Sequence, residues 1–224
     1  MASSRLKQQI LDPDKTRVIR LQANLVREEH FFLAGGIGLA LRLGHRLSAD
    51  LDWFTPDRFD AGKLQQRLED LEEKPSRILC HGKHTLRAYY GTLETSFISY
   101  EQVPARPEVM KVAGTEIPVA DLEIIAAMKA AAVHDRGAKR DFIDIHAICT
   151  QSGWSVGRFI EHASRLLPLQ SEQVARALTY FVDAEHDPVP AGCTVAWQKV
   201  KADLSQGAQA WENGRRHKRS PSKG

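Results

Sequence analysis

The segment from Leu33 to Phe54 constrains the fold of this chain more than any other part of the sequence. A short apolar run ends at a double glycine, Gly35-Gly36, and an apolar stretch with helical character follows. Glycine lets the backbone turn tightly at the start of a helix, where free N–H groups attract an anion. The pattern therefore predicts a strand, a glycine turn and a helix that suit a phosphate group.

Two carboxylates, Asp50 and Asp52, follow this helix and are flanked by apolar residues. Side chains on a strand alternate between its faces, so we expect the two to share one face. Like charges at that spacing repel each other unless a cation lies between them. Mg²⁺ prefers a few carboxylates together with phosphate oxygens and water. The pair therefore predicts a Mg²⁺ site, whereas a bare Asp-x-Asp elsewhere is more often a solvated strand edge.

The segment resembles the signature of the AbiEii nucleotidyltransferase toxin family, part of the polymerase-β-like nucleotidyltransferase superfamily. The family pattern is a Gly-Gly-Thr or Gly-Gly-Ser turn, a helix, and then Arg-x-Ser-x-Asp-x-Asp-Phe. The matching positions are Gly35, Gly36, Arg46, Ser48, Asp50 and Asp52. A second block resembles the family's helix with a lysine followed by Arg-Asp-x-x-Asp, at Lys129, Arg140, Asp141 and Asp144.

The resemblance implies a role for each matching residue. Four residues would be catalytic: Asp50, Asp52, Lys129 and Asp141. The nucleotide would be bound by Gly35, Gly36, Arg46, Ser48 and Lys129. The metal would be held by Asp50 and Asp52.

The sequence departs from the family at two places. Ile37 follows the double glycine, where the family usually has a hydroxyl that bonds a phosphate. Related enzymes commonly carry a third carboxylate on a later strand, and Ser96 occupies the matching place here. Glu94 lies two residues earlier on the same strand face, so either Glu94 substitutes as the third carboxylate or two carboxylates suffice.

Lys129 lies on the apolar stripe of its predicted helix rather than opposite it. A buried ammonium is costly unless an anion meets it, and a triphosphate or Asp141 would serve. A lysine whose charged end reaches solvent at the edge of the stripe is the alternative. Asp141 and Asp144 share a helical face and need cationic partners. For these two carboxylates, a purely structural ion pair between helices is the alternative to a catalytic role.

The order of predicted elements indicates an α+β protein, and the resemblance implies a polymerase-β-like nucleotidyltransferase core with a small mixed sheet, followed by a helical C-terminal half. We expect a core over residues 1–118, a helical region over 119–212 that packs on it, and a basic disordered tail over 213–224. Helices are predicted at 14–29, 38–44, 61–72, 121–134, 139–150, 155–167, 171–181 and 194–211. Strands are predicted at 31–34, 49–54, 77–80, 85–90 and 92–100, and a surface connection at 103–118.

Composition excludes several classes of protein. The 224 residues carry a formal net charge of only +3, and the 42% hydrophobic content is ordinary for a globular protein. Three cysteines without a Cys-x-x-Cys pair suggest neither zinc nor a disulfide framework. No apolar run approaches the length of a membrane span, and the start lacks the apolar centre of a signal peptide. We therefore expect a cytoplasmic protein.

The leading functional hypothesis is a Mg²⁺-dependent nucleotidyltransferase, the toxin of a toxin–antitoxin system of the abortive-infection type. It would transfer NMP from an NTP to an RNA hydroxyl and release pyrophosphate; family resemblance favours the tRNA 3′ end as acceptor. The expected partners are the NTP, the acceptor RNA and a cognate antitoxin protein. One alternative is transfer of NMP or phosphate to a protein or small molecule. Another is a catalytically decayed nucleotide-binding or regulatory module.

Overall fold

A mixed β-sheet organises the N-terminal part of the chain in the computed structural model, which describes residues 9–80, 82, 84–102 and 104–219. The strands are β1 (Phe32–Leu33), β2 (Leu51–Thr55), β3 (Arg77–Cys80), β4 (Thr85–Tyr90), β5 (Leu93–Ser99), β6 (Pro107–Val112) and β7 (Thr115–Ala120). Within these described residues they form one seven-stranded sheet in the order β3-β4-β5-β2-β1-β7-β6. Strand β1 pairs in parallel with β7, β2 pairs in parallel with β5, and the other neighbours are antiparallel.

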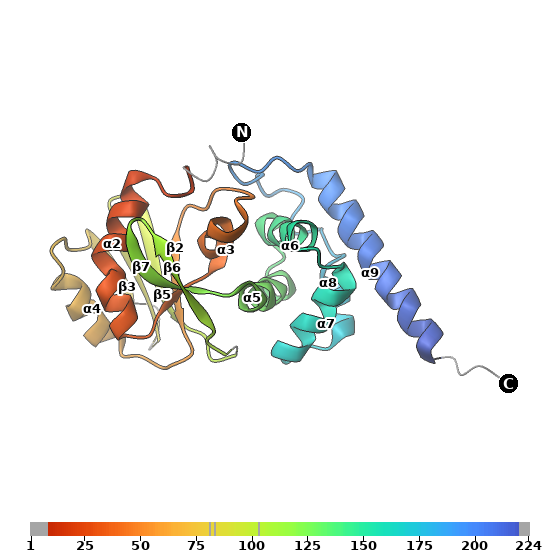
Figure 1. Ribbon diagram of the computed structural model, residues 1–224, viewed down its shortest axis with the longest axis horizontal. Helices are drawn as coiled ribbons and strands as arrows, with labels where there is room; N and C mark the ends of the chain where they lie inside the picture. Colours follow the sequence, from red (N-terminus) through yellow and green to blue (C-terminus); the bar gives the residue numbers. More distant parts are fainter. Residues whose placement is uncertain (1–8, 81, 83, 103, 220–224) are drawn as a thin grey trace. The chain divides into compact units, whose positions relative to one another are not determined.

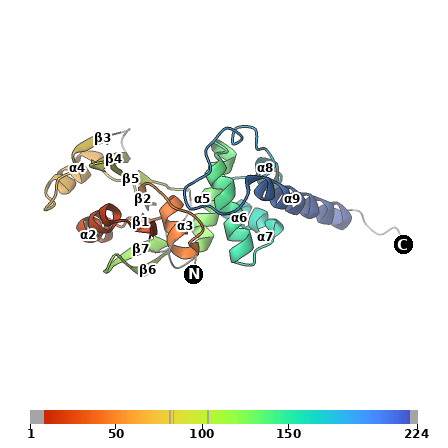
Figure 2. The same cartoon turned by 90° about the horizontal axis from the view of Figure 1, so that it is seen from above.

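Three helices pack against this sheet: α2 (Pro13–Glu28), α3 (Gly35–Leu43) and α4 (Ala61–Glu69). Figures 1 and 2 show α2 and α4 on one face of the sheet and α3 on the other. Successive side chains of β2 point to opposite faces of the sheet, so the strand contacts the helices on both faces. Leu51 and Trp53 are fully buried, and the Trp53 indole donates a hydrogen bond of 2.9 Å to Gln22 of α2. Asp52 therefore points to the opposite face, toward the beginning of α3.

Strands β6 and β7 replace the surface connection that the sequence predicted for residues 103–118. They form an antiparallel hairpin whose two-residue turn, Ala113-Gly114, has φ values of +55° and +82°. Positive φ at both positions is typical of the tight turns that suit a twisted hairpin. Pro104, Pro107 and Pro118 are the reason that the sequence predicted a connection here rather than strands. Pro107 begins the edge strand, and Pro118 lies in β7, which pairs with the short β1 only at Leu33 and Val119.

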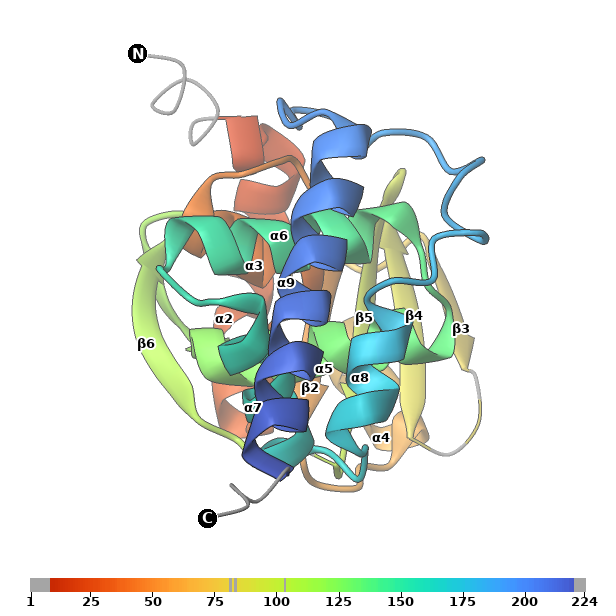
Figure 3. The same ribbon diagram turned by 90° about the vertical axis from the view of Figure 1, so that its right-hand side faces the viewer.

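Five helices follow over the described residues of the C-terminal part: α5 (Leu122–Asp135), α6 (Lys139–Gln151), α7 (Val156–Leu166), α8 (Ser171–Ala177) and α9 (Trp197–Arg219). Figure 3 shows α9 crossing α6 and α7 along much of its length. The chain divides into two compact units, Met1–Ile125 and Ala126–Gly224, so the division falls within α5. A boundary after residue 118, as the sequence predicted, would divide β7, which runs from Thr115 to Ala120. The α+β class and the helical C-terminal half are both as expected.

The C-terminal tail is helical as far as Arg219, whereas the sequence predicted disorder from residue 213. Arg215, one of the basic residues there, has partners that composition does not reveal. Arg215 lies 4.8 Å from the centre of the Trp211 ring and forms an ion pair of 2.9 Å with Glu172. Trp211 itself is buried against α7, which extends the packing of α9 to its last turns. Residues 220–224 lie outside the described residues.

Across the described residues, no helix has both the length and the apolar character needed to cross a membrane.

Candidate active site

The glycine turn and Asp52 lie in direct contact. Gly35 has a φ of +63°, and a methyl group added to it would lie 2.7 Å from Oδ2 of Asp52. The backbone N–H of Ala34 donates a hydrogen bond of 3.0 Å to the carbonyl oxygen of Asp52. The end of β1, the start of α3 and one carboxylate of β2 are therefore held together. The absence of a side chain at Gly35 is what allows this approach.

The second glycine faces a cation and a hydroxyl. A methyl group added to Gly36 would lie 2.7 Å from both Nη2 of Arg46 and Oγ of Ser48. Arg46 is only 4% exposed, and its Nη1 donates a hydrogen bond of 2.7 Å to the carbonyl oxygen of Leu47. A guanidinium group and a helix N-terminus both attract anions. The first turn of α3 therefore has anion-attracting groups on one side and a carboxylate on the other.

Asp50 lies one residue before β2 and is exposed, whereas Asp52 is partly buried within the strand. The predicted strand at 49–54 thus begins later than expected, at Leu51. No three His, Cys, Asp or Glu side chains of the described residues group as a ready metal site. The donors present still suit Mg²⁺, because this ion usually binds one or two carboxylates and completes its shell with water and substrate phosphates. Asp50 and Asp52 would be the residues that hold it.

The place of the third carboxylate is occupied by Ser96. Strands β2 and β5 pair in parallel with Asp52 opposite Ser96, so both side chains point to one face of the sheet. The same register, carried one residue back from the Leu51–Thr95 pair, aligns Asp50 with Glu94. Ser96 is 4% exposed and donates a hydrogen bond of 3.3 Å to Oε1 of Glu94. Glu94 therefore lies two residues before Ser96 on β5, on the face of the sheet that Asp52 also occupies.

Two residues of β4 that the sequence analysis did not single out hold Glu94. The Tyr89 hydroxyl donates a hydrogen bond of 2.7 Å to Oε2 of Glu94, and this bond raises the pKa of Tyr89. Nε of Arg87 lies 3.4 Å from Oε1 of the same carboxylate. The signal that could have found them is register, because Tyr89 pairs with Glu94 and Arg87 with Ser96 across the hairpin. Register depends on the turn at Gly91, which side-chain motifs do not encode.

In the helical unit, Lys129 is buried between two carboxylates. Its Nζ lies 2.9 Å from Oδ1 of Asp141 and 2.6 Å from Oδ2 of Asp144. Lys129 is 5% exposed, and both aspartates are fully buried. The prediction that an anion meets a buried Lys129 is confirmed, since Asp141 and Asp144 both do so. The alternative of a lysine reaching out to solvent is excluded by this burial.

Arg136 completes the cluster from the end of α5. Its Nε and Nη2 donate hydrogen bonds of 2.9 and 3.1 Å to the two oxygens of Asp141. Burial alone would raise the pKa of the Asp141 carboxyl. The charge of Lys129 and the hydrogen bonds from Arg136 outweigh burial and hold that pKa below its usual value. Asp141 is therefore an ionised carboxylate fixed by two cations, which suits it to orient Lys129.

Comparison with known proteins identifies the family of this chain. The model of the family described as nucleotidyl transferase AbiEii toxin, type IV toxin–antitoxin system, matches residues 21–217. An uncharacterised protein of Aquifex aeolicus (strain VF5) is 31% identical over 174 residues, which is 76% of this chain and 82% of that protein.

Solved structures share the fold. A protein of H. pylori that is provisionally named a nucleotidyltransferase aligns with a TM-score of 0.60 at 20% identity, over 95% of this chain and 98% of its own. MenT4, a nucleotidyltransferase toxin of Mycobacterium tuberculosis H37Rv, aligns with a TM-score of 0.54 at 16% identity, over 96% of this chain and 90% of its own. Since the family model matches most of the sequence, the chain is a nucleotidyltransferase and belongs to the AbiEii toxin family of type IV toxin–antitoxin systems.

Proposed function

We propose that this nucleotidyltransferase transfers NMP from an NTP to a hydroxyl group of RNA, with the tRNA 3′ end as acceptor, in a reaction that needs Mg²⁺. The observation that carries this proposal is the contact of the Gly35-Gly36 turn with Asp52 on one side and with Arg46 and Ser48 on the other. Such a turn accepts an anion, and the adjacent carboxylate provides for the metal that accompanies a triphosphate. The acceptor is the part of the proposal that rests on family resemblance.

The proposed reaction is an in-line displacement at the α-phosphorus. The acceptor oxygen forms a new bond to the α-phosphorus, the bond between the α- and β-phosphates breaks, and pyrophosphate leaves. Mg²⁺, when bound, would neutralise phosphate charge and favour ionisation of the attacking hydroxyl. The backbone N–H groups at the start of α3, together with Arg46 and Ser48, would hold the triphosphate. Positioning and charge stabilisation do most of the work in phosphoryl transfer, so a serine at position 96 is compatible with activity.

Two further groups have proposed roles in this reaction. Glu94 would accept the proton of the attacking hydroxyl, and its position two residues before Ser96, the partner of Asp52, supports this role. Lys129 would carry positive charge to the nucleotide, and Asp141 would orient it. A cognate antitoxin would restrain the enzyme, as membership of a toxin–antitoxin family implies, and the cytoplasm is where its substrates and partner would meet it.

The test is transfer of label from α-³²P NTPs, each supplied singly, to total cellular RNA in the presence of Mg²⁺. We expect label in RNA, its loss with a chelator, and its loss in Asp52→Asn, which keeps the shape of the side chain but removes its charge. Asp57→Asn is the matched control, because Asp57 is an exposed carboxylate just beyond the other end of β2. Label that appears only in protein, or transfer that persists in Asp52→Asn, would contradict the proposal.

A further inference from the structure

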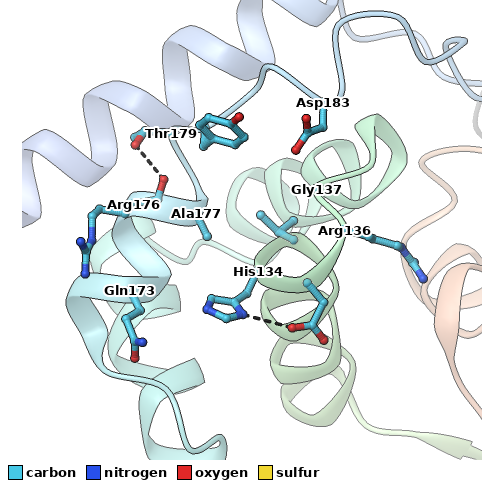
Figure 4. A pocket seen from close by; sticks show the side chains of 11 residues that line it. His134, Arg136, Gly137, Gln173, Arg176, Ala177, Thr179 and Asp183 are labelled. Carbon is cyan, nitrogen blue, oxygen red and sulfur yellow. Dashed lines mark hydrogen bonds and ion pairs between the residues drawn. The ribbon is translucent and has the colours of Figure 1, made fainter.

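The helical unit contains a hollow of about 630 Å³ that shares Arg136 with the Lys129 cluster. It is formed by the end of α5, by α8 and by the segment that follows α8. Figure 4 shows His134 of α5 facing the side of α8 that carries Gln173 and Ala177, with Asp183 above them on the following segment. A volume of this size falls in the range of ligand pockets, and suits one or two nucleotides rather than a helix.

Three side chains around this hollow make neither an ion pair nor a side-chain to side-chain hydrogen bond among the described residues. Tyr180 is 54% exposed, and its side chain makes no hydrogen bond or ring contact there, whereas its neighbour Phe181 packs against Phe142 and Trp197. Arg176 forms no ion pair with any described residue, and its only side-chain bond is to a backbone carbonyl. The carboxylate of Asp183 has neither a hydrogen bond nor an ion pair within the described part of the chain. The ring of Tyr180, the guanidinium group of Arg176 and the carboxylate of Asp183 line this hollow and are available to a ligand.

These three groups match the chemistry of unpaired RNA. Single-stranded nucleic acid is held by bases stacked on aromatic rings and by arginine contacts to phosphate. A carboxylate accepts a hydrogen bond from the amino group of a base such as cytosine. The amide nitrogen of Gln173 can donate to a base edge, because its oxygen is already bonded to the backbone N–H of Gln170. A phosphorylated peptide fits less well, because it could reach Arg176 but has no nucleobase to stack on Tyr180.

We infer that this pocket binds unpaired nucleotides of the acceptor RNA, with a base stacked on Tyr180, a phosphate on Arg176 and a base amino group on Asp183. The inference rests on the proposed function, because it names where that acceptor is held. Arg136 connects the two sites within the helical unit: it lines the pocket, while its guanidinium group bonds Asp141 beside Lys129. An RNA end held here would therefore border the ionic cluster of the same unit.

The first experiment measures binding of a fluorescein-labelled single-stranded RNA with a free 3′ hydroxyl to the full-length protein. Tyr180→Ala should weaken binding about tenfold or more, and Tyr180→Phe should bind like the wild type, because stacking needs only the ring. Arg176→Gln should lower the slope of log affinity against log salt concentration by about 0.7, the contribution of one phosphate contact to a single strand. Arg165→Gln is the matched control, because Arg165 is an exposed arginine of α7 outside the pocket, and it should leave the slope unchanged.

The second experiment measures transfer of label to total tRNA by the same variants. Tyr180→Ala and Arg176→Gln should raise KM for RNA and leave KM for the NTP unchanged. If wild type labels RNA and both variants match it in affinity and KM, the pocket assignment is wrong and the proposed function stands. If wild type labels protein but no RNA, both are wrong. If the variants lose labelling of a protein acceptor, the pocket serves a protein instead, which also overturns the inference.

Discussion

At the scale of single residues, Gly35 links the geometry of the backbone to the position of a carboxylate. Its φ of +63° is one that residues with a side chain adopt only at a cost, and Oδ2 of Asp52 occupies the space a methyl group would need. Two separate effects therefore act at this glycine. The first is backbone strain, and the second is displacement of Asp52 from the start of α3.

Gly35→Ala should show both effects. We expect the free energy of unfolding to fall by about 1–2 kcal/mol from backbone strain, and transfer activity to fall as well because Asp52 must move. Gly153→Ala is the matched control, since Gly153 lies between α6 and α7 and has a φ of +67° with nothing within 4 Å of the added methyl group. It should lose similar stability and keep its activity. Denaturant unfolding and labelled-NTP transfer measure the two effects, and equal activity losses in both variants would contradict the role of the Asp52 contact.

Lys129 is the residue whose removal should cost the most stability. Lys129→Met leaves the fully buried Asp144 without its lysine partner, and breaking a buried pair in this way typically costs about 3–5 kcal/mol. Adding Asp144→Asn to that variant should recover part of the loss, because the uncompensated charge is removed. Lys199→Met, which breaks an exposed pair with Asp203, should change stability by about 1 kcal/mol or less. Urea unfolding of these variants is the measurement, and similar losses at positions 129 and 199 would argue against a buried charge.

At the scale of secondary-structure elements, two glycines allow α9 and α7 to approach each other closely. A methyl group added to Gly207 would overlap Cγ2 of Val156, and one added to Gly157 would lie 3.1 Å from Cδ1 of Trp211. In the same helix, Gly214 has nothing within 4 Å of the added methyl group. The close approach of the two helices therefore depends on position 207 and not on position 214.

Alanine substitution of the two α9 glycines, Gly207 and Gly214, should change stability in opposite directions. Gly214→Ala should raise stability by about 0.5–1 kcal/mol, because alanine is the better helix former and meets no neighbour. Gly207→Ala should lower stability, since the methyl group overlaps the branched side chain of Val156. Thermal unfolding of the two variants measures the difference. A gain in stability at both positions would show that α7 and α9 do not approach each other this closely.

Sequence reasoning identified the elements that carry strong local signals. The cap at Asp12 and the proline that follows it mark the start of α2, and the apolar alternation of β2 marks its two faces. The β6–β7 hairpin was not predicted from the sequence. Prolines argue against a strand unless it is known which strand edges lack a pairing partner. Sequence reasoning also placed the start of the helix after the double glycine too late, at residue 38 rather than at Gly35.

In the candidate site, too, the contacts within a local motif were predictable from the sequence, and those set by cross-strand register were not. The contacts of Gly35 with Asp52 and of Gly36 with Ser48 follow from a short strand-turn-helix segment and its neighbouring strand, which a local motif describes. The arrangement around Glu94 was not predictable, because Tyr89 and Arg87 reach it through cross-strand register. Register is decided by turn geometry and by packing of the whole sheet.

At the scale of the whole molecule, acid should destabilise the protein partly through Asp141. The pKa of this carboxyl is lower in the folded protein than its ordinary value of 3.8. In acid, the unfolded chain therefore takes up a proton at this group before the folded chain does, and stability falls as the pH drops through that window. The contribution is fully present above the unfolded pKa and is lost as the pH falls through the folded pKa.

Asp141→Asn should flatten this dependence. The variant will be less stable at neutral pH, but its free energy of unfolding should decline less steeply below about pH 4, because one proton-binding difference between the two states has been removed. Asp57→Asn, at an exposed carboxylate, should keep the steepness of the wild type. Denaturant unfolding at a series of pH values measures the slopes. Parallel slopes for wild type and Asp141→Asn would contradict the lowered pKa.

The ionic cluster of the helical unit has a consequence for how its members can be exchanged. Lys129 and Arg136 bring two positive charges, and Asp141 and Asp144 bring two negative ones, so the charges of these four side chains sum to zero. Neutralising one member alone leaves a net charge in an interior that solvates charge poorly, whereas neutralising a cation together with an anion keeps the sum at zero. Substitutions in this cluster should therefore be tolerated in opposite-charge pairs rather than singly.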